Sequence, residues 1–200
     1  YDTFKDYYQR DPKLVPGYLT AQNKDNNLNG QMWEWAQAND SPLFISAGGA
    51  GAGKTYGWKN IVAEDLSLPE LEPGEDPNNS DWGYVMLTDQ DAEDDKVFAE
   101  TLAKYNGRFI GDDGEEHPHI IFLDDADKLL TTKSKALIAM MKKINDADPK
   151  NRVFKNPNTG KQEIWMGKII ITTNKDLAKL SESEDSKAIL SRATKSDIHF

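Results

Sequence analysis

The sequence contains no cysteine and no long apolar run. None of its apolar runs approaches the roughly 20 residues that a membrane-spanning helix needs. Without cysteine the chain has neither a disulfide framework nor thiolate chemistry, which is typical of a reducing compartment. Its 200 residues are enough for one sizeable hydrophobic core. We therefore expect a cytoplasmic protein with no membrane partner.

Arginine and histidine are also scarce, and the charges that are present are distributed unevenly. The formal net charge is −10 at pH 7. Residues 64–127 hold twenty acidic and only three basic residues, whereas residues 128–168 hold three acidic and ten basic residues. The acidic average argues against a general nucleic-acid binder, but the basic segment leaves a local contact with a phosphate backbone open.

Short apolar runs alternate with segments of helical periodicity. Apolar runs between turn residues predict buried strands, and apolar residues three or four positions apart predict amphipathic helices. Their alternation predicts an α/β fold in which a mostly parallel sheet is covered on both faces. We also expect a loop at 69–82, a turn at 111–118 and a β-hairpin at 151–166. The expected strands are 42–47, 84–88, 119–125, 168–174 and 197–200, and the expected helices are 31–38, 54–66, 91–105, 134–145 and 187–193.

A glycine- and alanine-rich loop joins the first expected strand to the helix after it. Residues 48–55, "GGAGAGKT", fit the phosphate-loop pattern G-x-x-x-x-G-K-[ST]. Such a loop aims backbone N–H groups at a nucleotide's phosphates, and the following helix presents its positive end. We expect Lys54 to reach the β- and γ-phosphates and Thr55 to supply a hydroxyl to Mg²⁺. The residues expected to bind the nucleotide are Gly48, Gly49, Ala50, Gly51, Ala52, Gly53, Lys54, Thr55 and Tyr56.

Acidic and amide residues follow two further apolar runs. Asp124 and Asp125 end the run that starts at Ile120, and Asn174 follows the run "KIIITT". In an open parallel sheet, ligands bind outside the carboxyl ends of the strands. We expect Asp124 to hold the water shell of Mg²⁺, Asp125 to orient or deprotonate the attacking water, and Asn174 to hold that water near the γ-phosphate. The alternatives are an acidic turn that caps the next helix and an ordinary turn asparagine.

One arginine, Arg192, closes the short helix expected before the last strand. An arginine at such an edge can reach the γ-phosphate in a neighbouring subunit and neutralise the charge of the transition state. The alternative is a surface salt bridge.

These four elements, in this order, resemble the core of AAA+ ATPases over residues 42–200. The resemblance implies a three-layer αβα P-loop NTPase with a parallel five-stranded sheet in the order 5-1-4-3-2. It also implies that Mg²⁺–ATP binds between the subunits of a homo-oligomeric ring, commonly a hexamer. By this resemblance, residues 48–55 are Walker A, Asp124 and Asp125 are Walker B, Asn174 is sensor 1 and Arg192 is the arginine finger.

Two features depart from that family. Glutamate usually follows the Walker B aspartate, but Asp125 stands here, and its shorter side chain favours slow hydrolysis or a differently held water. The chain also ends at Phe200, where the family usually continues into a small helical lid. We therefore expect residues 1–40 to be an N-terminal linker with a helical extension, and residues 41–200 to be the ATPase core without that lid.

The expected hairpin at 151–166 precedes the sensor 1 strand. A hairpin at this place resembles the pre-sensor-1 hairpin of one AAA+ branch, which includes viral replicative helicases. The arrangement also resembles AAA+ ATPases of large bacteriophages, for which the compartment is the host cytoplasm. Positive side chains on such a hairpin, here Arg152, Lys155 and Lys161, can follow the backbone of single-stranded DNA. The alternative is a solvated hairpin whose lysines discourage edge pairing.

The sequence therefore predicts an ATP hydrolase that drives remodelling of DNA, as a helicase or a replication-type motor. The alternatives are a protein-remodelling ATPase or chaperone, a clamp or helicase loader, and a scaffold that binds ATP and hydrolyses it slowly. We find no aromatic–hydrophobic–glycine motif after the second strand, which argues against a protein substrate. A P-loop kinase would need arginines on a mobile lid, and only three arginines accompany Arg192.

Overall fold

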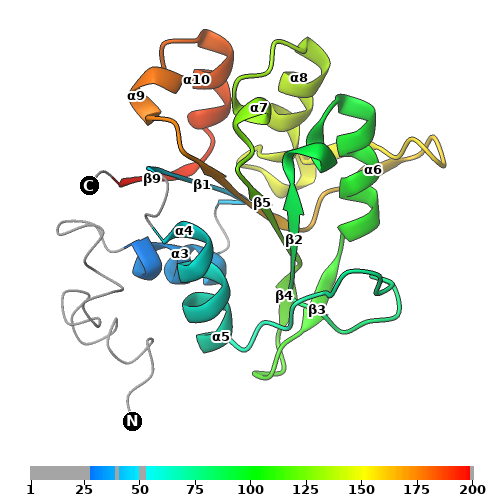
Figure 1. Cartoon of the computed structure of the whole chain (residues 1–200). Coiled ribbons are helices and arrows are strands. Elements are labelled where there is room, and N and C mark those ends of the chain that lie inside the picture. Colours follow the sequence, from blue (N-terminus) through cyan, green and yellow to red (C-terminus); the bar gives the residue numbers. More distant parts are fainter. Residues whose placement is uncertain (1–27, 39–40, 50–52, 199–200) are drawn as a thin grey trace.

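The computed structural model describes residues 28–38, 41–49 and 53–198. Within them a parallel five-stranded sheet lies between two layers of helices, so the α/β class is as expected (Figure 1). No helix in these ranges combines the length and the apolar character that a bilayer crossing requires. Residues 1–27 and loop residues 50–52 lie outside the described part of the chain.

The sheet brings three strand ends together at one edge. Its strands are β1 (Leu43–Gly48), β2 (Tyr84–Thr88), β5 (Ile120–Asp124), β8 (Lys168–Thr173) and β9 (Thr194–Ile198). They lie in the order β2-β5-β8-β1-β9, and every neighbouring pair is parallel. Counted in chain order within this sheet, the arrangement reads 5-1-4-3-2 from the β9 edge. Because β8 lies between β1 and β5, the segments that follow these three strands meet.

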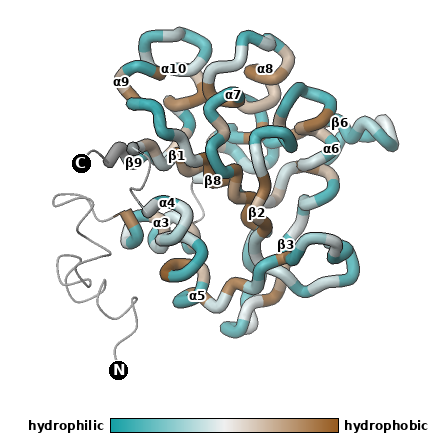
Figure 2. Tube along the Cα trace, in the orientation of Figure 1, coloured by the Kyte–Doolittle hydropathy of each residue, from teal (hydrophilic) through white to brown (hydrophobic). Residues whose placement is uncertain are grey.

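Helices cover both faces of the sheet (Figure 1). On one face lie α3 (Leu28–Gln37) and the helix after the glycine loop, composed of α4 (Lys54–Tyr56), η2 (Gly57–Val62) and α5 (Ala63–Asp65). On the other face lie α6 (Asp95–Tyr105), α7 (Asp127–Leu130), α8 (Lys135–Ile144), α9 (Leu177–Leu180) and α10 (Glu184–Leu190). Figure 2 shows the apolar residues gathered in the strands between these layers, with hydrophilic residues on the outer turns.

In β1, β2, β5 and β8 the side chains alternate between two apolar clusters. Ile169 and Ile171 of β8 pack in the cluster beneath α6 and α8, whereas Ile170 packs with Phe44 and Trp58 on the other face. All five side chains are fully buried. Burial on both faces explains why β1, β5 and β8 read as apolar runs, and it confirms that these three are buried strands.

The helix α3 belongs to this core and is not a linker. Its buried residues Met32 and Trp35 pack in the same cluster as Phe44. The buried ammonium of Lys168 donates to the backbone oxygens of Trp35 and Ala38 at the carboxyl end of α3, and it lies 4.9 Å from the centre of the Trp35 ring. A cation at that end of a helix is favourable. The helix α3 therefore packs against the sheet as part of the core.

The helix after the glycine loop forms as expected, but its middle, η2, is π-helical. Gly57 opens this segment against α3, and a Cβ atom at Gly57 would lie only 2.1 Å from Oδ1 of Asn29. Glycine therefore permits the close approach of the two helices. The next residue, Trp58, is fully buried, and its ring stacks on Phe122 with the ring centres 6.1 Å apart.

Several expected elements differ in the structure. The strand expected at 197–200 is β9 (Thr194–Ile198), and the helix expected at 187–193 is α10 (Glu184–Leu190). The helix expected at 91–105 begins at Asp95, because the carboxylate of Asp94 accepts the N–H of Val97 (2.8 Å) and caps the helix there. The segment expected as a turn at 111–118 ends in a strand of a short hairpin. The elements that the sequence did not predict include η3 (Asp89–Ala92), β3 (Arg108–Ile110), β4 (Glu116–Pro118) and η4 (Pro149–Asn151).

A second hairpin projects from the molecule between α8 and β8 (Figure 1). Its strands β6 (Val153–Lys155) and β7 (Gln162–Ile164) are antiparallel. The side chain of Asn106, just after α6, holds the base of this hairpin. Its amide nitrogen donates to the carbonyl of Ile164 and its oxygen accepts the N–H of Met166, each at 2.9 Å. The hairpin is therefore anchored to the helical layer while its tip is exposed.

Candidate functional site

The glycine loop leads from the carboxyl end of β1 into α4. Gly53 caps α4 in the left-handed conformation (φ 81°), which glycine adopts without steric cost. Lys54 and Thr55 follow in the first turn of the helix. The phosphate cradle expected from Ala50, Gly51 and Ala52 lies outside the described residues, so it stays a prediction.

The ammonium of Lys54 is buried at the mouth of the loop, with only 6% of the residue exposed. Its Nζ donates to the carbonyl oxygens of Gly48 (2.8 Å) and Gly49 (3.1 Å) and to Oδ1 of Asn174 (3.1 Å). Burial lowers the pKa of Lys54, while the negative charges of the nearby aspartates, Asp125 first, oppose that shift. The lysine and the asparagine singled out in the sequence are therefore in direct contact.

Asp124 lies at the end of β5 and accepts two hydroxyl groups. Its Oδ1 accepts the hydroxyl of Thr55 at 2.9 Å and the hydroxyl of Thr172 at 2.9 Å. Thr55 comes from the helix after the loop, and Thr172 comes from the neighbouring strand β8. Three separate segments of the chain therefore meet at one carboxylate oxygen.

Asp125 follows at a turn in the left-handed region, with φ 49°. Its backbone N–H donates to Oγ1 of Thr172 (2.9 Å), which fixes this turn against β8. Desolvation raises the pKa of the Asp125 carboxyl, and the charge of Asp124 raises it further, although Lys54 acts in the opposite direction. Asp125 is therefore a better proton acceptor near neutral pH than an ordinary aspartate.

Thr172 is a positioning residue that our sequence analysis did not single out. It is fully buried, donates to Asp124 and accepts from the backbone of Asp125, so it links both acidic residues to β8. The next residue repeats the pattern, because the hydroxyl of Thr173 donates to the carboxylate of Asp127. The sequence feature that could have indicated this role is the pair of threonines after the three isoleucines of β8.

The other expected nucleotide and catalytic residues lie farther from these contacts. Tyr56 is 56% exposed on α4. The guanidinium of Arg192 donates to the carbonyl of Ala188 in α10 (2.7 Å), and no hydrogen bond joins it to Lys54 or Asp124 within the described residues. Contact of Tyr56 with a nucleotide and action of Arg192 in a neighbouring subunit stay predictions.

Arg152, expected as a possible DNA contact, is buried in the structure. Only 8% of this residue is exposed, and its Nε donates to the carbonyl of Asp146 (2.7 Å), so it holds the segment after α8. Burial lowers the pKa of the Arg152 guanidinium. Lys155 and Lys161 of the same hairpin are exposed, and their contact with DNA stays a prediction.

The groups around Asp124 fit a magnesium ion. Mg²⁺ prefers oxygen ligands and is usually bound through one or two carboxylates together with phosphate oxygens and water. The hydroxyl of Thr55 lies beside Asp124, and among the described residues no group donates to Oδ2 of Asp124. Asp124, Asp125 and Asp127 all act on the charge of Lys54. This excess of carboxylates would repel a bare polyphosphate, and a divalent cation would offset that repulsion.

The sequence matches no protein-family model and no curated protein. The structure resembles crystal structures of NtrX from Brucella abortus. The complex with ATP is 15% identical with a TM-score of 0.48, and the match covers 84% of this chain and 34% of that one. The complex with ADP is 14% identical with a TM-score of 0.49, and the match covers 98% of this chain and 41% of that one. The chain thus spans about a third to two fifths of those proteins, and at these TM-scores the likeness identifies neither a family nor an activity.

The hydroxyl of Thr172 gives a direct test of this arrangement. Thr172→Val keeps the shape of the side chain but leaves the N–H of Asp125 without its acceptor. We expect hydrogen exchange at the Asp125 amide, measured by NMR, to accelerate roughly tenfold, because a lost hydrogen bond costs on the order of 1 kcal/mol. Thr172→Ser retains the hydroxyl and should keep the protection. Unchanged protection in the valine variant would show that Thr172 does not hold this turn.

Proposed function

We propose that this chain is a P-loop ATPase of the AAA+ kind, which binds Mg²⁺–ATP and hydrolyses it to ADP and inorganic phosphate. The observation that carries the proposal is the contact network that joins Lys54 to Asn174 and Thr55 to Asp124 at one edge of the sheet. A buried lysine at a glycine loop, a hydroxyl beside a carboxylate and a neutral amide are the groups that phosphoryl transfer to water requires.

Lys54 would bind the phosphates by exchanging partners. Its Nζ is held by the carbonyl oxygens of Gly48 and Gly49, which are neutral acceptors. A phosphate oxygen is a charged acceptor, and charge-assisted hydrogen bonds are roughly twice as strong as neutral ones. Thr55 and Asp124 would hold Mg²⁺, which neutralises phosphate charge when bound. The network is therefore already arranged around the position of the ligand.

Hydrolysis transfers the γ-phosphoryl group to water. The water oxygen forms a bond to the γ-phosphorus, the bond from that phosphorus to the bridging oxygen breaks, and ADP leaves with the electron pair. Asp125 accepts the proton of the water and passes it to solvent, a role that its raised pKa favours. Asn174, fixed by its contact with Lys54, orients the water or the γ-phosphate through its amide.

The lysine variant tests nucleotide binding. We expect Lys54→Ala to weaken binding of Mg²⁺–ATP roughly a hundredfold, because it removes a charged hydrogen-bond donor from a buried site. Binding can be followed at equilibrium with a fluorescent ATP analogue. Lys59→Ala is the matched control, since Lys59 lies on the same helix but pairs with Glu70 (3.3 Å). Wild-type affinity in Lys54→Ala would refute the phosphate-loop assignment.

Asp125 provides a separate test of the chemical step. Asp125→Asn should retain ATP binding but lose hydrolysis by a factor of roughly 10²–10⁴, the usual contribution of a general base. In the wild type only the ionised carboxylate accepts a proton, so the rate should fall as the pH is lowered through the pKa of Asp125. Because that pKa is raised, the fall should occur at a higher pH than for an ordinary aspartate.

The control for this step is Asp125→Glu, which restores the longer side chain and should hydrolyse ATP at least as fast as the wild type. Full activity of Asp125→Asn would mean that another group activates the water.

A second part of the proposal concerns the process that ATP hydrolysis drives. We favour remodelling of DNA by a homo-oligomeric ring, in which Arg192 serves the ATP site of a neighbouring subunit. The support for DNA is the projecting hairpin β6–β7, where Lys155 and Lys161 are exposed and near no carboxylate partner within the described residues. Exposed lysines on a projecting element suit the backbone of a single strand.

Steady-state ATP hydrolysis with and without single-stranded DNA at low salt tests this part. We expect several-fold stimulation that Lys155→Ala/Lys161→Ala removes and that the control Lys142→Ala/Lys143→Ala on α8 retains. Hydrolysis that is indifferent to DNA would instead favour a protein-remodelling ATPase. Tight ATP binding without hydrolysis would favour a nucleotide-dependent scaffold.

A further inference from the structure

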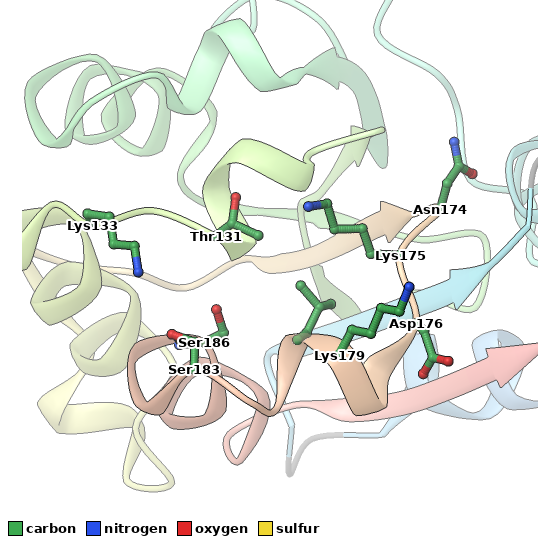
Figure 3. Close-up of a pocket in the computed structure, with 9 residues that line it drawn as sticks. Thr131, Lys133, Asn174, Lys175, Asp176, Lys179, Ser183 and Ser186 are labelled. Atoms are coloured by element: carbon green, nitrogen blue, oxygen red, sulfur yellow. Dashed lines mark hydrogen bonds between the residues drawn. The ribbon is translucent and has the colours of Figure 1, made fainter.

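A cavity of about 510 Å³ opens beside Asn174, on the side of the sheet covered by α7 to α10 (Figure 3). Its volume lies within the range of roughly 300–1,000 Å³ that is usual for small-molecule sites. One wall is the segment between α7 and α8, the opposite wall is the segment from β8 into α9, and the floor is the start of α10. We call this cavity the lysine pocket. Its lining residues include Thr131, Lys133, Asn174, Lys175, Lys179 and Ser183.

Positive charge dominates the lysine pocket. Lys133 and Lys175 extend into it from opposite walls (Figure 3), and Lys179 is the third ammonium in its lining. In the described part of the chain no carboxylate oxygen lies within 4.0 Å of these three ammonium groups. The lining carboxylate, Asp176, is engaged by the N–H of Ala178 (2.7 Å) as the cap of α9. The three positive charges are therefore not neutralised by ion pairs.

The neutral polar groups of the pocket add donors. Ser183 Oγ accepts the N–H of Ser186, so its own hydroxyl hydrogen is available to a ligand. Asn174 uses its oxygen to accept from Lys54, which leaves its NH₂ group for a second partner. A pocket of ammonium, hydroxyl and amide donors matches a ligand that has several acceptors and more than one negative charge. Phosphate has both properties, and lysine binds it as a point charge.

Asn174 joins the lysine pocket to the candidate ATP site. Its oxygen contacts the lysine of the glycine loop, and the same residue lines the pocket. A phosphate ion that leaves the position beside Lys54 therefore passes a neutral amide before it meets uncompensated ammonium groups.

We propose that the lysine pocket binds inorganic phosphate, and that it receives the phosphate released by hydrolysis at Lys54. The second statement rests on the proposed ATPase function, whereas the first does not. Phosphate could reach the pocket from the ATP site or from the surrounding solution, and the two experiments below distinguish these sources.

The first experiment measures binding of inorganic phosphate to the full chain by isothermal titration calorimetry, without nucleotide. We expect Lys133→Gln/Lys179→Gln to weaken binding roughly tenfold or more, because it removes two charged donors. Lys135→Gln/Lys187→Gln removes the same charge from exposed positions outside the pocket and should bind as the wild type does. No binding by the wild type, or equal binding by the pocket variant, would overturn the proposal.

The second experiment follows a single turnover of ATP. Cleavage is measured by acid quench, and appearance of free phosphate is measured with a fluorescent phosphate-binding reporter. We expect Lys133→Gln/Lys179→Gln to cleave ATP at the wild-type rate but to release phosphate several-fold more slowly, because the receiving site is lost. The control pair Lys135→Gln/Lys187→Gln should change neither rate.

The two experiments separate the failure of each proposal. Equal release rates in the wild type and the pocket variant would overturn the link to hydrolysis and leave a site filled from solution. A wild type that binds phosphate but does not cleave ATP would refute the proposed function and the role in product release, while the phosphate site itself would stand.

Discussion

The parallel pairing of β8 with both β1 and β5 is the constraint on which the candidate site depends. It aligns the ends of three strands, so that Gly48, Asp124 and Asn174, which are far apart in the sequence, reach the same edge of the sheet. The contacts of Lys54 and Thr172 follow from this register. A shift of β8 by one residue would turn the hydroxyl of Thr172 to the opposite face and separate both acidic residues from their support.

Negatively charged groups outnumber positively charged ones at this edge of the sheet. Three aspartates surround a single buried lysine, and their charges oppose the loss of its proton that burial favours. Desolvation by burial raises the pKa of Asp125, and the charge of Asp124 raises it further. A divalent ion between these carboxylates and a polyphosphate removes the repulsion on both sides. The acidic excess of residues 64–127, which looked unsuited to an anionic ligand, is therefore compatible with a metal-bound one.

The sequence predicted what depends on local pattern and failed where burial depends on the tertiary structure. Four strands of the sheet followed from apolar runs, whereas the last strand was expected at 197–200 and is β9 (Thr194–Ile198). The rule that ligands bind outside the carboxyl ends of parallel strands grouped Asn174 with Asp124 and the glycine loop, but it did not predict the direct contact of Asn174 with Lys54. Charge alone could not reveal that Arg152 is buried against the carbonyl of Asp146. The role of Thr172 was equally hidden, because threonine is common in strands and its partners lie on β5 and in the next turn. Likewise, the sequence of α3 did not predict that this helix packs in the core.

Asn174 is a neutral residue between two regions of opposite charge, the carboxylates near Asp124 and the ammonium groups of the lysine pocket. Carboxylates dominate the side of Asp124, and ammonium groups dominate the lysine pocket. In the proposed function, a nucleotide with its metal ion would tolerate the first side, whereas a phosphate without the metal would be repelled there and attracted to the second. An acidic residue in place of Asn174 would put a negative charge between the two sites, and a basic one would repel Lys54. A neutral amide can hold Lys54 on one side and still let the anion pass to the other.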